Sequence, residues 1–476
     1  MNSSSQMRYF LWTLLTLTII TGPSCHKQDF LDKKPSTTLL VPSTLSDFQA
    51  LLDNVKVFGL VPTLGEASSD NYFVSYPTWL LMTPREHNAY VWAKDFYNGQ
   101  GGQQDWNVPY QQIYYANVVL EGLKSMRSFP DSVAQWNALE GAALFCRAFA
   151  FYNLAQLFAP VYDSATAGTD LGIPLRTSSL VDTLSGRSTV KATYQQILGD
   201  LLGATSYLSA GLPGKTLNRP VKITAQALLA RVYLSMRNYS KARLYADSVL
   251  QAYSALIDYN DLSLATPVPI PLINVETLYQ ASFLGAPTSA PYFSSISALY
   301  STTWIDTNLI KSYDSNDLRR VIFYRSRPGD TTSLKYSYNA TAYPFGGLAV
   351  DELLLISAEG AARAGDLGVA INNINTLLRS RWKRGTYTDY TVASVGDVLG
   401  MVLDERRKEL AFRGLRWTDL RRLNKEGANI ILTRILVDSA QNARRDTLAP
   451  NSLNYTLPIP PDVLNLNPAI QQNSRN

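Results

Sequence analysis

The sequence predicts a mainly α-helical protein, an α-α superhelix of paired helices interrupted by long irregular segments. Three observations support this fold class. Apolar residues recur at three- and four-residue spacing along most of the chain. Two of the predicted helix pairs can be aligned with each other. The 476 residues are 46% hydrophobic and only 17% charged, so the chain can bury a large core without metal ions or disulfide bonds.

The first residues are typical of a processing signal. A polar stretch at 1–8 precedes an apolar run at 9–20, which is shorter than the roughly 20 residues that a bilayer-spanning helix needs. We therefore expect residues 1–24 to be an export signal peptide. The cleavage region resembles a bacterial lipobox, in which Cys25 becomes the lipid-modified first residue of the mature chain, although Gly22 stands where an aliphatic residue is usual. An ordinary signal peptide is the alternative.

The cysteine content fits a lipidated protein. The second cysteine, Cys146, lies in an apolar helical stretch at 141–158, where a buried free thiol is expected. If Cys25 is acylated, no disulfide can form within the chain, and the core must be stable alone. Several acyl chains on Cys25 would hold the protein at a membrane, because one chain binds only marginally. The expected mature protein is one domain of residues 25–476.

Eight stretches carry the helical spacing. Two segments between them, 60–102 and 253–344, are rich in aromatic residues, Pro and Gly, and are predicted to hold loops and a few short strands. Loops of this length in a compact domain are usually functional. The predicted helices span residues 113–126, 134–158, 190–208, 222–236, 239–251, 351–364, 367–380 and 395–412.

Two of these helix pairs resemble each other. Residues 227–250 can be aligned with residues 354–378, so that the turn at 237–238 falls on the turn at 365–366. Small residues at the contact positions would let antiparallel helices approach closely, which resembles the tetratricopeptide repeat. Two ordinary helical hairpins are the alternative, and either interpretation gives an α-α superhelical scaffold.

The stretch at 405–423, ERRKELAFRGLRWTDLRRL, places many charges among apolar residues. Four of its charged side chains project into a broad apolar arc when a helix is drawn at 100° per residue. They are Glu405, Arg406, Glu409 and Arg413. A buried charge without its partner costs roughly 3–5 kcal/mol, so we expect an internal ion network that fixes how helices pack. A solvated helix face is the alternative.

The spacing also suggests partners for these charges. Glu409 can reach Arg406 and Arg413 at three- and four-residue spacing. Glu405 would be repelled by Glu409 and needs a cation from another helix. The candidates for that cation are Arg147, Arg231 and Arg363. Glu359 could equally pair with Arg406.

The remaining charges argue against a nucleic-acid partner. Asp404, Arg407 and Lys408 point away from the apolar arc, so the basic residues are not gathered on one accessible face. The formal net charge of +5 is also small for a chain of this length.

The stretch at 405–423 resembles the C-terminal signature of the SusD/RagB family, surface lipoproteins that capture nutrients beside a TonB-dependent outer-membrane transporter. Other motifs of that family follow in order along the mature chain. They are Cys25 with FLDKKP, then WNVPYQQIYYAN at 106–117, CRAFAFYNLAQLF at 146–158, GIPL at 172–175, RSTVKATYQQILGDL at 187–201, ALLARVYL at 227–234, DELLLISAEGAARAGD at 351–366 and LPIPPDVLNLNPAIQQN at 457–473. The chain departs from the family at the lipobox and at 379–385, where an Arg-Ala-Gly turn is more usual.

This resemblance implies a surface-exposed lid, lipid-anchored in the outer membrane, above a SusC-like TonB-dependent barrel. Ligand would bind between lid and barrel, and the transporter would supply the energy for import. The lid would need neither a catalytic residue nor a cofactor.

Catalytic motifs are scarce in the sequence. His26 and His87 are the only histidines and are far apart in the sequence. A histidine-rich metal site, or a Ser-His-Asp or Cys-His catalytic arrangement, would therefore have few histidines to draw on. GLPGKT at 211–216 is not a phosphate-binding loop, because Ser209 stands where its first glycine is needed. Paired carboxylates for glycoside hydrolysis have no motif to support them. We therefore expect no enzyme activity and no metal site.

The two loop-rich segments provide the candidate ligand contacts. Aromatic rings would stack on sugar faces, while Asn, Asp, Gln or Arg side chains bind hydroxyl groups. Trp79 and Trp304 are the strongest candidates, because each lies among Ser, Thr and Pro rather than in a helical apolar stripe. The further candidates are Tyr76, Trp92, Tyr97, Tyr292 and Tyr300. Trp106 and Trp417 are excluded, because they belong to the structural motifs of the family.

Three functions are thus in competition. A glycan-capturing lipoprotein is the leading hypothesis. An oligopeptide-capturing lid of the same kind of transporter is the alternative, and a surface hydrolase is the third.

Overall fold

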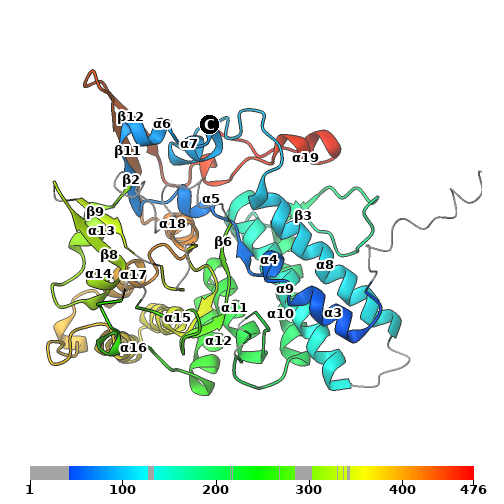
Figure 1. Ribbon diagram of the computed structural model, residues 1–476, viewed down its shortest axis with the longest axis horizontal. Helices are drawn as coiled ribbons and strands as arrows, with labels where there is room; N and C mark the ends of the chain where they lie inside the picture. The colour runs from blue at the N-terminus through cyan, green and yellow to red at the C-terminus, as the bar shows by residue number, and fades with distance from the viewer. Residues whose placement is uncertain are drawn as a thin grey trace, which may run out of the picture. The chain divides into compact units, whose positions relative to one another are not determined.

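Long helices dominate the computed structural model (Figure 1). It describes residues 42–126, 133–214, 216, 218–266, 269–284, 303–329, 331–335, 337–339 and 343–476. The expected signal peptide, Cys25, Tyr292 and Tyr300 lie outside these ranges. The prediction of a mainly helical fold is confirmed.

The first half of the scaffold consists of four helices. They are α3 (Leu45–Leu52), α8 (Gln104–Met126), α9 (Val133–Phe158) and α10 (Val190–Tyr207). Helix α9 packs against both α8 and α10 and is buried over most of its length. Its Cys146 is a buried free cysteine, as predicted, and burial raises the pKa of its thiol to about 12. Helix α3 lies so close to α8 that a Cβ atom on Gly122 would be 2.1 Å from the ring of Phe48.

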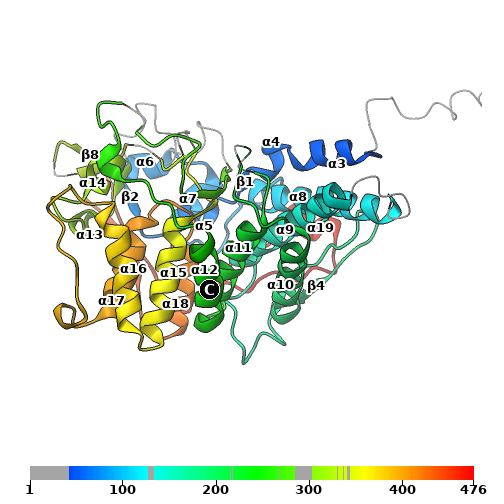
Figure 2. The same cartoon turned by 90° about the horizontal axis from the view of Figure 1, so that it is seen from below.

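The second half continues the row of helices. Each of them packs against its neighbours in the row, and Figure 2 shows them side by side. At the contact of α12 with α15, a Cβ atom on Gly360 would be 2.7 Å from Cβ of Arg243, so only glycine permits this approach. The helices are α11 (Lys222–Ser235), α12 (Tyr239–Ala252), α15 (Val350–Arg363), α16 (Leu367–Arg379) and α17 (Val398–Glu409).

The two aligned helix pairs, α11–α12 and α15–α16, share the same turn. Arg237 and Gly365 both adopt positive φ angles, of 60° and 81°. The N–H of the next residue then bonds back to the helix, from Asn238 to Tyr233 O and from Asp366 to Ala361 O, each at 2.9 Å. Both turns therefore end the first helix with the same left-handed capping motif. The Asn238 and Asp366 side chains then cap the second helix of each pair.

The loop-rich segments contain short helices and two-stranded sheets. The short helices inside or beside these segments are α4 (Val55–Phe58), α5 (Leu64–Ala67), α6 (Tyr76–Leu80), α7 (Pro84–Tyr90), α13 (Thr307–Lys311) and α14 (Leu318–Phe323). The strand pairs inside or beside these segments are β1 (Leu60–Val61) with β6 (Ser282–Phe283), β2 (Tyr72–Val74) with β7 (Thr303–Ile305), β5 (Thr277–Tyr279) with β10 (Leu348–Ala349), and β8 (Tyr324–Arg327) with β9 (Thr331–Leu334). Because β1–β6 and β2–β7 each join the two segments, residues far apart in sequence meet in one region.

The charged stretch at 405–423 is not a single helix. Helix α17 ends at Glu409, and α18 (Arg416–Lys425) begins after a turn in which Phe412 and Gly414 have φ angles of 60° and 75°. A Cβ atom on Gly414 would also be 2.9 Å from the Phe283 ring. Close packing and left-handed backbone therefore interrupt the helix here.

The structure also contains two more strand pairs and a short α-helix. They are β3 (Leu171–Pro174) with β4 (Arg187–Thr189), β11 (Leu432–Val437) with β12 (Ala443–Leu448), and α19 (Pro461–Leu466). Within the described ranges, no helix has both the length and the apolar character to span a membrane.

Candidate ligand-binding groove

The charged side chains in and after α17 lie inside the protein. Each of the four is at most 7% exposed: Glu405, Arg406, Glu409 and Arg413. The Glu409 carboxylate accepts hydrogen bonds from Arg319 Nη1 and Arg381 Nε, both at 2.8 Å. Arg319 lies at the start of α14, two residues after its own partner Asp317, which caps that helix. The network therefore joins α17 to α14 and to the segment after α16.

The partners of Glu409 differ from those that the helical spacing suggested. Arg406 donates to Asp419 at 2.9 Å, and Arg413 donates to Asp351 at 2.8 Å. The predicted pairing of Glu409 with Arg406 and Arg413 is wrong. Its carboxylate faces the elements packed against α17 instead of lying along its own helix, and the chain turns at Phe412 before it reaches Arg413.

The predicted partners of Glu405 are also wrong. Glu405 accepts from Arg319 Nη2 at 2.9 Å and from Lys408. Each of the three arginines proposed as its partner pairs with a different carboxylate. These pairs are Arg147 with Asp200, Arg231 with Glu352, and Arg363 with Glu359. Glu359 in turn accepts from Arg422 at 2.6 and 2.8 Å and not from Arg406.

The pKa of Glu409 reflects this arrangement. Burial alone would raise it, but the charges and hydrogen bonds of Arg381 and Arg319 lower the pKa to about 2. The carboxylate therefore stays ionised inside the protein. Because the inward face of α17 is fixed in this way, the outward side chains Asp404 and Arg407 are held at the wall of a groove.

Three of the aromatic residues predicted to bind ligand are core residues. Trp79 and Trp92 are 4% and 3% exposed. Their indole N–H groups donate to backbone oxygens, Trp79 to His87 O at 3.0 Å and Trp92 to Ser68 O at 2.9 Å. Tyr97 is buried too and donates to Pro458 O. These rings are therefore not available as stacking platforms. The sequence does not reveal that α6 and the segment after α7 pack these rings against the rest of the protein.

The other described candidates are partly exposed. Tyr76 packs beside Trp79, with ring centroids 5.7 Å apart. Trp304 lies on β7 directly opposite Phe73 on β2, and the two ring centroids are 5.4 Å apart. Their strand neighbours, such as Tyr72 and Ile305, point into the core. Because successive side chains of a strand point to opposite faces, Phe73 and Trp304 lie together on the outer face of the β2–β7 pair, which we call the β2–β7 ribbon.

A groove of about 640 Å³ borders this ribbon. Its walls come from β2, α13, α17, α18 and the beginning of β11. The lining residues are Asp70, Tyr72, Phe73, Asp306, Asn308, Gly400, Leu403, Asp404, Arg407, Arg416, Leu423, Ala428, Ile430, Ile431, Leu432, Thr433 and Arg434. The predicted residue Trp304 does not itself line the groove, but it packs against Phe73, which does.

Charged groups of both signs line the groove. Arg416 holds Asp70 with two hydrogen bonds of 2.7 and 2.8 Å. Arg407 bridges Asp70 and Asp306 at 3.3 and 3.2 Å. Although burial opposes ionisation of Asp70, the hydrogen bond and charge of Arg416 and the charge of Arg407 hold its pKa well below its usual range. A neutral ligand with many hydroxyl groups could donate to these carboxylates and accept from the guanidinium groups and from Asn308.

Some residues of this groove could be anticipated from local sequence patterns. Arg407 and Asp404 point outward on the helical wheel, and Asp70, Phe73, Asp306 and Asn308 lie within the two loop-rich segments. That these segments meet at the β2–β7 ribbon is a long-range pairing that no local pattern reveals.

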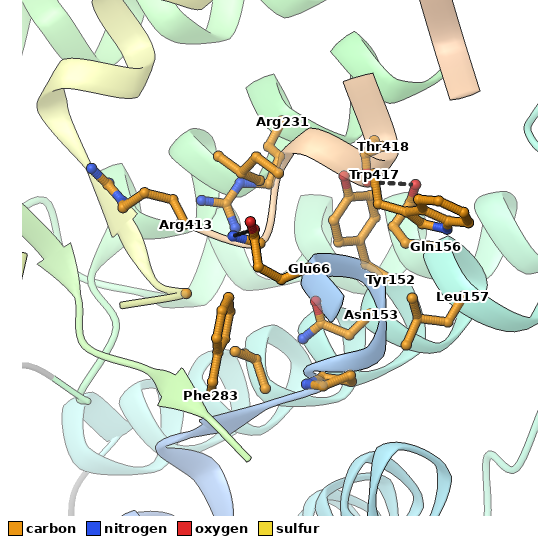
Figure 3. A pocket seen from close by; sticks show the side chains of 16 residues that line it. Glu66, Tyr152, Asn153, Gln156, Leu157, Arg231, Phe283, Arg413, Trp417 and Thr418 are labelled. Carbon is orange, nitrogen blue, oxygen red and sulfur yellow. Dashed lines mark hydrogen bonds between the residues drawn. The ribbon is translucent and has the colours of Figure 1, made fainter. Parts of the chain in front are cut away.

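A smaller cavity of about 50 Å³ lies between residues of α5, α9 and α18 (Figure 3). The Glu66 carboxylate, on α5, accepts from Gly414 N–H at 3.0 Å and from Asn71 at 2.7 Å, and burial raises its pKa. Asn153 Nδ2 and Trp417 Nε1 also line the cavity, and neither has a hydrogen-bond partner among the described residues. The cavity has the size and polarity of a site for ordered water. It is too small for an oligosaccharide, so the groove remains the candidate ligand site.

Comparisons with known proteins place this architecture in a family. Residues 29–234 match a family model described as starch-binding and associating with the outer membrane, and residues 329–475 match the model of the SusD family. A SusD-like protein P2 of Formosa agariphila is 25% identical over 377 residues, covering 67% of this chain and 71% of the relative. The chain belongs to the SusD/RagB family.

Solved structures share the fold. A SusD superfamily protein of Bacteroides thetaiotaomicron superimposes with a TM-score of 0.71 at 22% identity, covering 91% of this chain and 100% of that structure. The surface glycan-binding protein A of Bacteroides fluxus gives a TM-score of 0.65 at 15% identity, with 88% and 96% coverage.

Proposed function

We propose that the protein binds nutrient glycans at the cell surface and delivers them to a SusC-like TonB-dependent transporter of the outer membrane. Its membership of the SusD/RagB family supports this proposal, as does the starch-binding description of the model that its first half matches. The observation that carries the proposal is the Phe73–Trp304 pair on the outer face of the β2–β7 ribbon, beside a groove with charged groups of both signs.

In this function the groove binds and does not catalyse. The partly exposed ring of Trp304 supplies an apolar face for a sugar ring, as aromatic side chains do in polar-ligand sites. Asp306, Asn308 and Arg407 supply the hydrogen bonds that select hydroxyl positions. The buried network of α17 keeps Arg407 in place, so little conformational entropy is lost on binding.

The proposed cell-surface location of the protein depends on Cys25. Acylation there would anchor the chain in the outer membrane, where the groove could lie above the transporter barrel. Cargo would then pass from groove to barrel without any chemical step in the lid.

Calorimetry with the soluble chain that begins after Cys25 tests the proposal. We expect oligosaccharides found on a glycan array to bind, and Trp304→Ala to weaken binding at least about tenfold, because burial of such a ring contributes about 1.5–3 kcal/mol. Trp382→Ala is the matched control. Trp382 is also partly exposed, but it packs on Tyr387, which does not line the groove, whereas Trp304 packs on the groove residue Phe73. Loss of Trp382 should therefore leave affinity unchanged.

Two results would overturn the glycan proposal. Heat released by oligopeptides but by no oligosaccharide would favour the peptide-binding alternative. Turnover of a glycan substrate, abolished by replacing a single Asp or Glu, would favour a hydrolase.

A further inference from the structure

The β11–β12 hairpin projects at one end of the structure (Figure 1). Its six-residue strands are the longest in the described part of the chain. The inward side chains of β11 are buried, while Ile435 and Val437 on its outer face are 52% and 43% exposed, and Ile431 just before the strand is 62% exposed. A long strand edge with exposed apolar side chains is a surface that natural proteins usually protect.

The hydrogen-bond register shows which backbone groups of β11 are free. Asp438 N–H donates to Asn442 O at the end of the hairpin, so these two residues form a hydrogen-bonded pair. In an antiparallel ladder such pairs alternate with non-bonded ones. Because Val437 pairs with Ala443 and Ile435 with Arg445, the N–H and C=O groups of Thr433, Ile435 and Val437 point away from β12. No other described strand pairs with that edge.

A buried arginine holds this edge in place. Arg434, on the inward face of β11, donates to Tyr90 O at 3.2 Å, to Tyr72 O at 2.6 Å and to Ser69 O. Its guanidinium also lies 4.1 Å from the centre of the Tyr90 ring. The hairpin is therefore fixed to the body of the protein, and a partner binding its edge would lose little entropy in ordering it.

We propose that the free edge of β11 binds an extended segment of the transporter by strand addition. The inference rests on the proposed function, which supplies the transporter as the partner. Free N–H and C=O groups at every second residue are complementary to the backbone of an extended polypeptide and not to the irregular hydroxyl pattern of a glycan. The exposed side chains of Ile435 and Val437 would pack against alternate apolar residues of the added strand.

The beginning of β11 lies at the groove proposed to bind glycans. Ile431 and Thr433, at the beginning of the strand, line the groove proposed to bind glycans. An added strand would run along the same wall, so the transporter segment and the cargo would lie next to each other.

A proline substitution separates the backbone contribution from that of the side chain. Ile435→Pro removes an N–H that makes no bond to β12, so the hairpin should form and the melting temperature should be kept. Ile435→Thr removes the exposed apolar side chain but keeps the N–H. The full-length lipidated variants are purified from outer membranes, and the transporter that co-purifies is quantified. We expect Ile435→Pro to lower the amount of co-purified transporter about tenfold, because roughly one hydrogen bond is lost and its neighbours are weakened. Ile435→Thr should lower that amount less.

Hydrogen exchange of the unmodified complex is the second measurement. The amides of Thr433, Ile435 and Val437 should exchange fast in the free chain and slowly with transporter bound, whereas Arg434 and Leu436 should be slow in both. Unchanged capture by Ile435→Pro together with fast exchange of the edge amides in the complex would overturn the inference and leave the transporter partnership intact. The edge amides could instead exchange slowly when the chain self-associates, or when it binds only oligosaccharide. Either result would show that the edge has another occupant and would also overturn the inference. Failure of the unmodified chain to retain any transporter would overturn both the partnership and this inference.

Discussion

At the scale of single residues, Glu409 is the centre of the buried network. Its carboxylate binds Arg319 and Arg381, and both arginines are fully buried. Arg319 also binds Asp317 and Glu405, and Arg381 also binds Glu276, so these two arginines and four carboxylates form one connected set. Removing Glu409 leaves Arg319 Nη1 and Arg381 Nε without their acceptor where water cannot reach them.

Glu409→Ala is therefore expected to lower the free energy of unfolding by roughly 3–5 kcal/mol, as measured by urea denaturation. Asp389→Ala is the control, because it breaks the exposed pair of Asp389 with Arg379 and exposed pairs contribute little. Equal stability of the two variants would mean that water solvates Glu409.

The lowered pKa of Glu409 also predicts an acid dependence. A carboxylate whose pKa is lower in the folded chain stabilises the fold above its ordinary value, about 4.3. That contribution is lost as the pH falls from there to about 2. The unfolding free energies of the natural chain and of Glu409→Gln should therefore differ most above pH 5 and converge toward pH 2. A difference that is constant across this range would contradict the assignment.

The sequence indicated that these charges face the interior, but it did not indicate which residues pair with them. A helical wheel shows which side of α17 each residue occupies, and the apolar arc around Glu405 and Glu409 suggested burial. It contains no information on Arg319, 90 residues before Glu409, or on Arg381. Both lie outside the predicted helices or at their ends, and they reach Glu409 only because α14 and the end of α16 pack beside α17.

At the scale of elements, the close contact of α12 with α15 depends on Gly360. Ala at this position would place its Cβ atom 2.7 Å from Arg243 Cβ and 3.0 Å from Tyr239 O. We expect Gly360→Ala to lower the free energy of unfolding by about 1–3 kcal/mol, because the two helices must separate.

Gly368→Ala is the matched control for Gly360→Ala. Gly368 lies near the start of α16, is exposed, and has open space where a Cβ atom would lie. There the alanine should stabilise the helix by about 0.4–1 kcal/mol. Equal effects of the two substitutions in thermal unfolding would show that the α12–α15 contact is loose.

Elements were predictable where the pattern is local. The helices have a regular apolar spacing, and the aligned turns at 237–238 and 365–366 share their capping motif in the structure. The β11–β12 hairpin was not predicted, because LTRILV has no visible alternation of apolar and polar residues. Arg434 occupies one of the buried positions, and its charge is accommodated by backbone oxygens of β2, α7 and the segment before β2 and by the Tyr90 ring.

At the scale of the whole molecule, one helix serves both the scaffold and the proposed site. The inward face of α17 carries Glu405 and Glu409 in the ion network, and its outward face presents Asp404 and Arg407 to the groove. The two loop-rich segments meet above this helix through the β2–β7 ribbon. A change in the network would therefore move groove residues that it does not touch.

This link predicts that Glu409→Ala, besides its effect on stability, weakens glycan binding at temperatures where the variant is folded. We expect a loss of affinity smaller than that of Trp304→Ala, because Arg407 and Asp404 are displaced and not removed. Calorimetry well below the melting temperature of the variant measures it. An unchanged affinity would show that the groove is rigid without the network.

The expected lipid anchor is separable from the fold. Residues 44–476 form one compact unit with its own core, and Cys25 precedes it. Cys25→Ala should therefore leave the melting temperature and the oligosaccharide affinity unchanged, while the protein moves from the membrane fraction to the soluble fraction. The experiment is carried out in cells without the transporter, because the transporter itself could retain the variant at the membrane. A variant still wholly in the membrane fraction of such cells would contradict lipidation at Cys25 as the anchor.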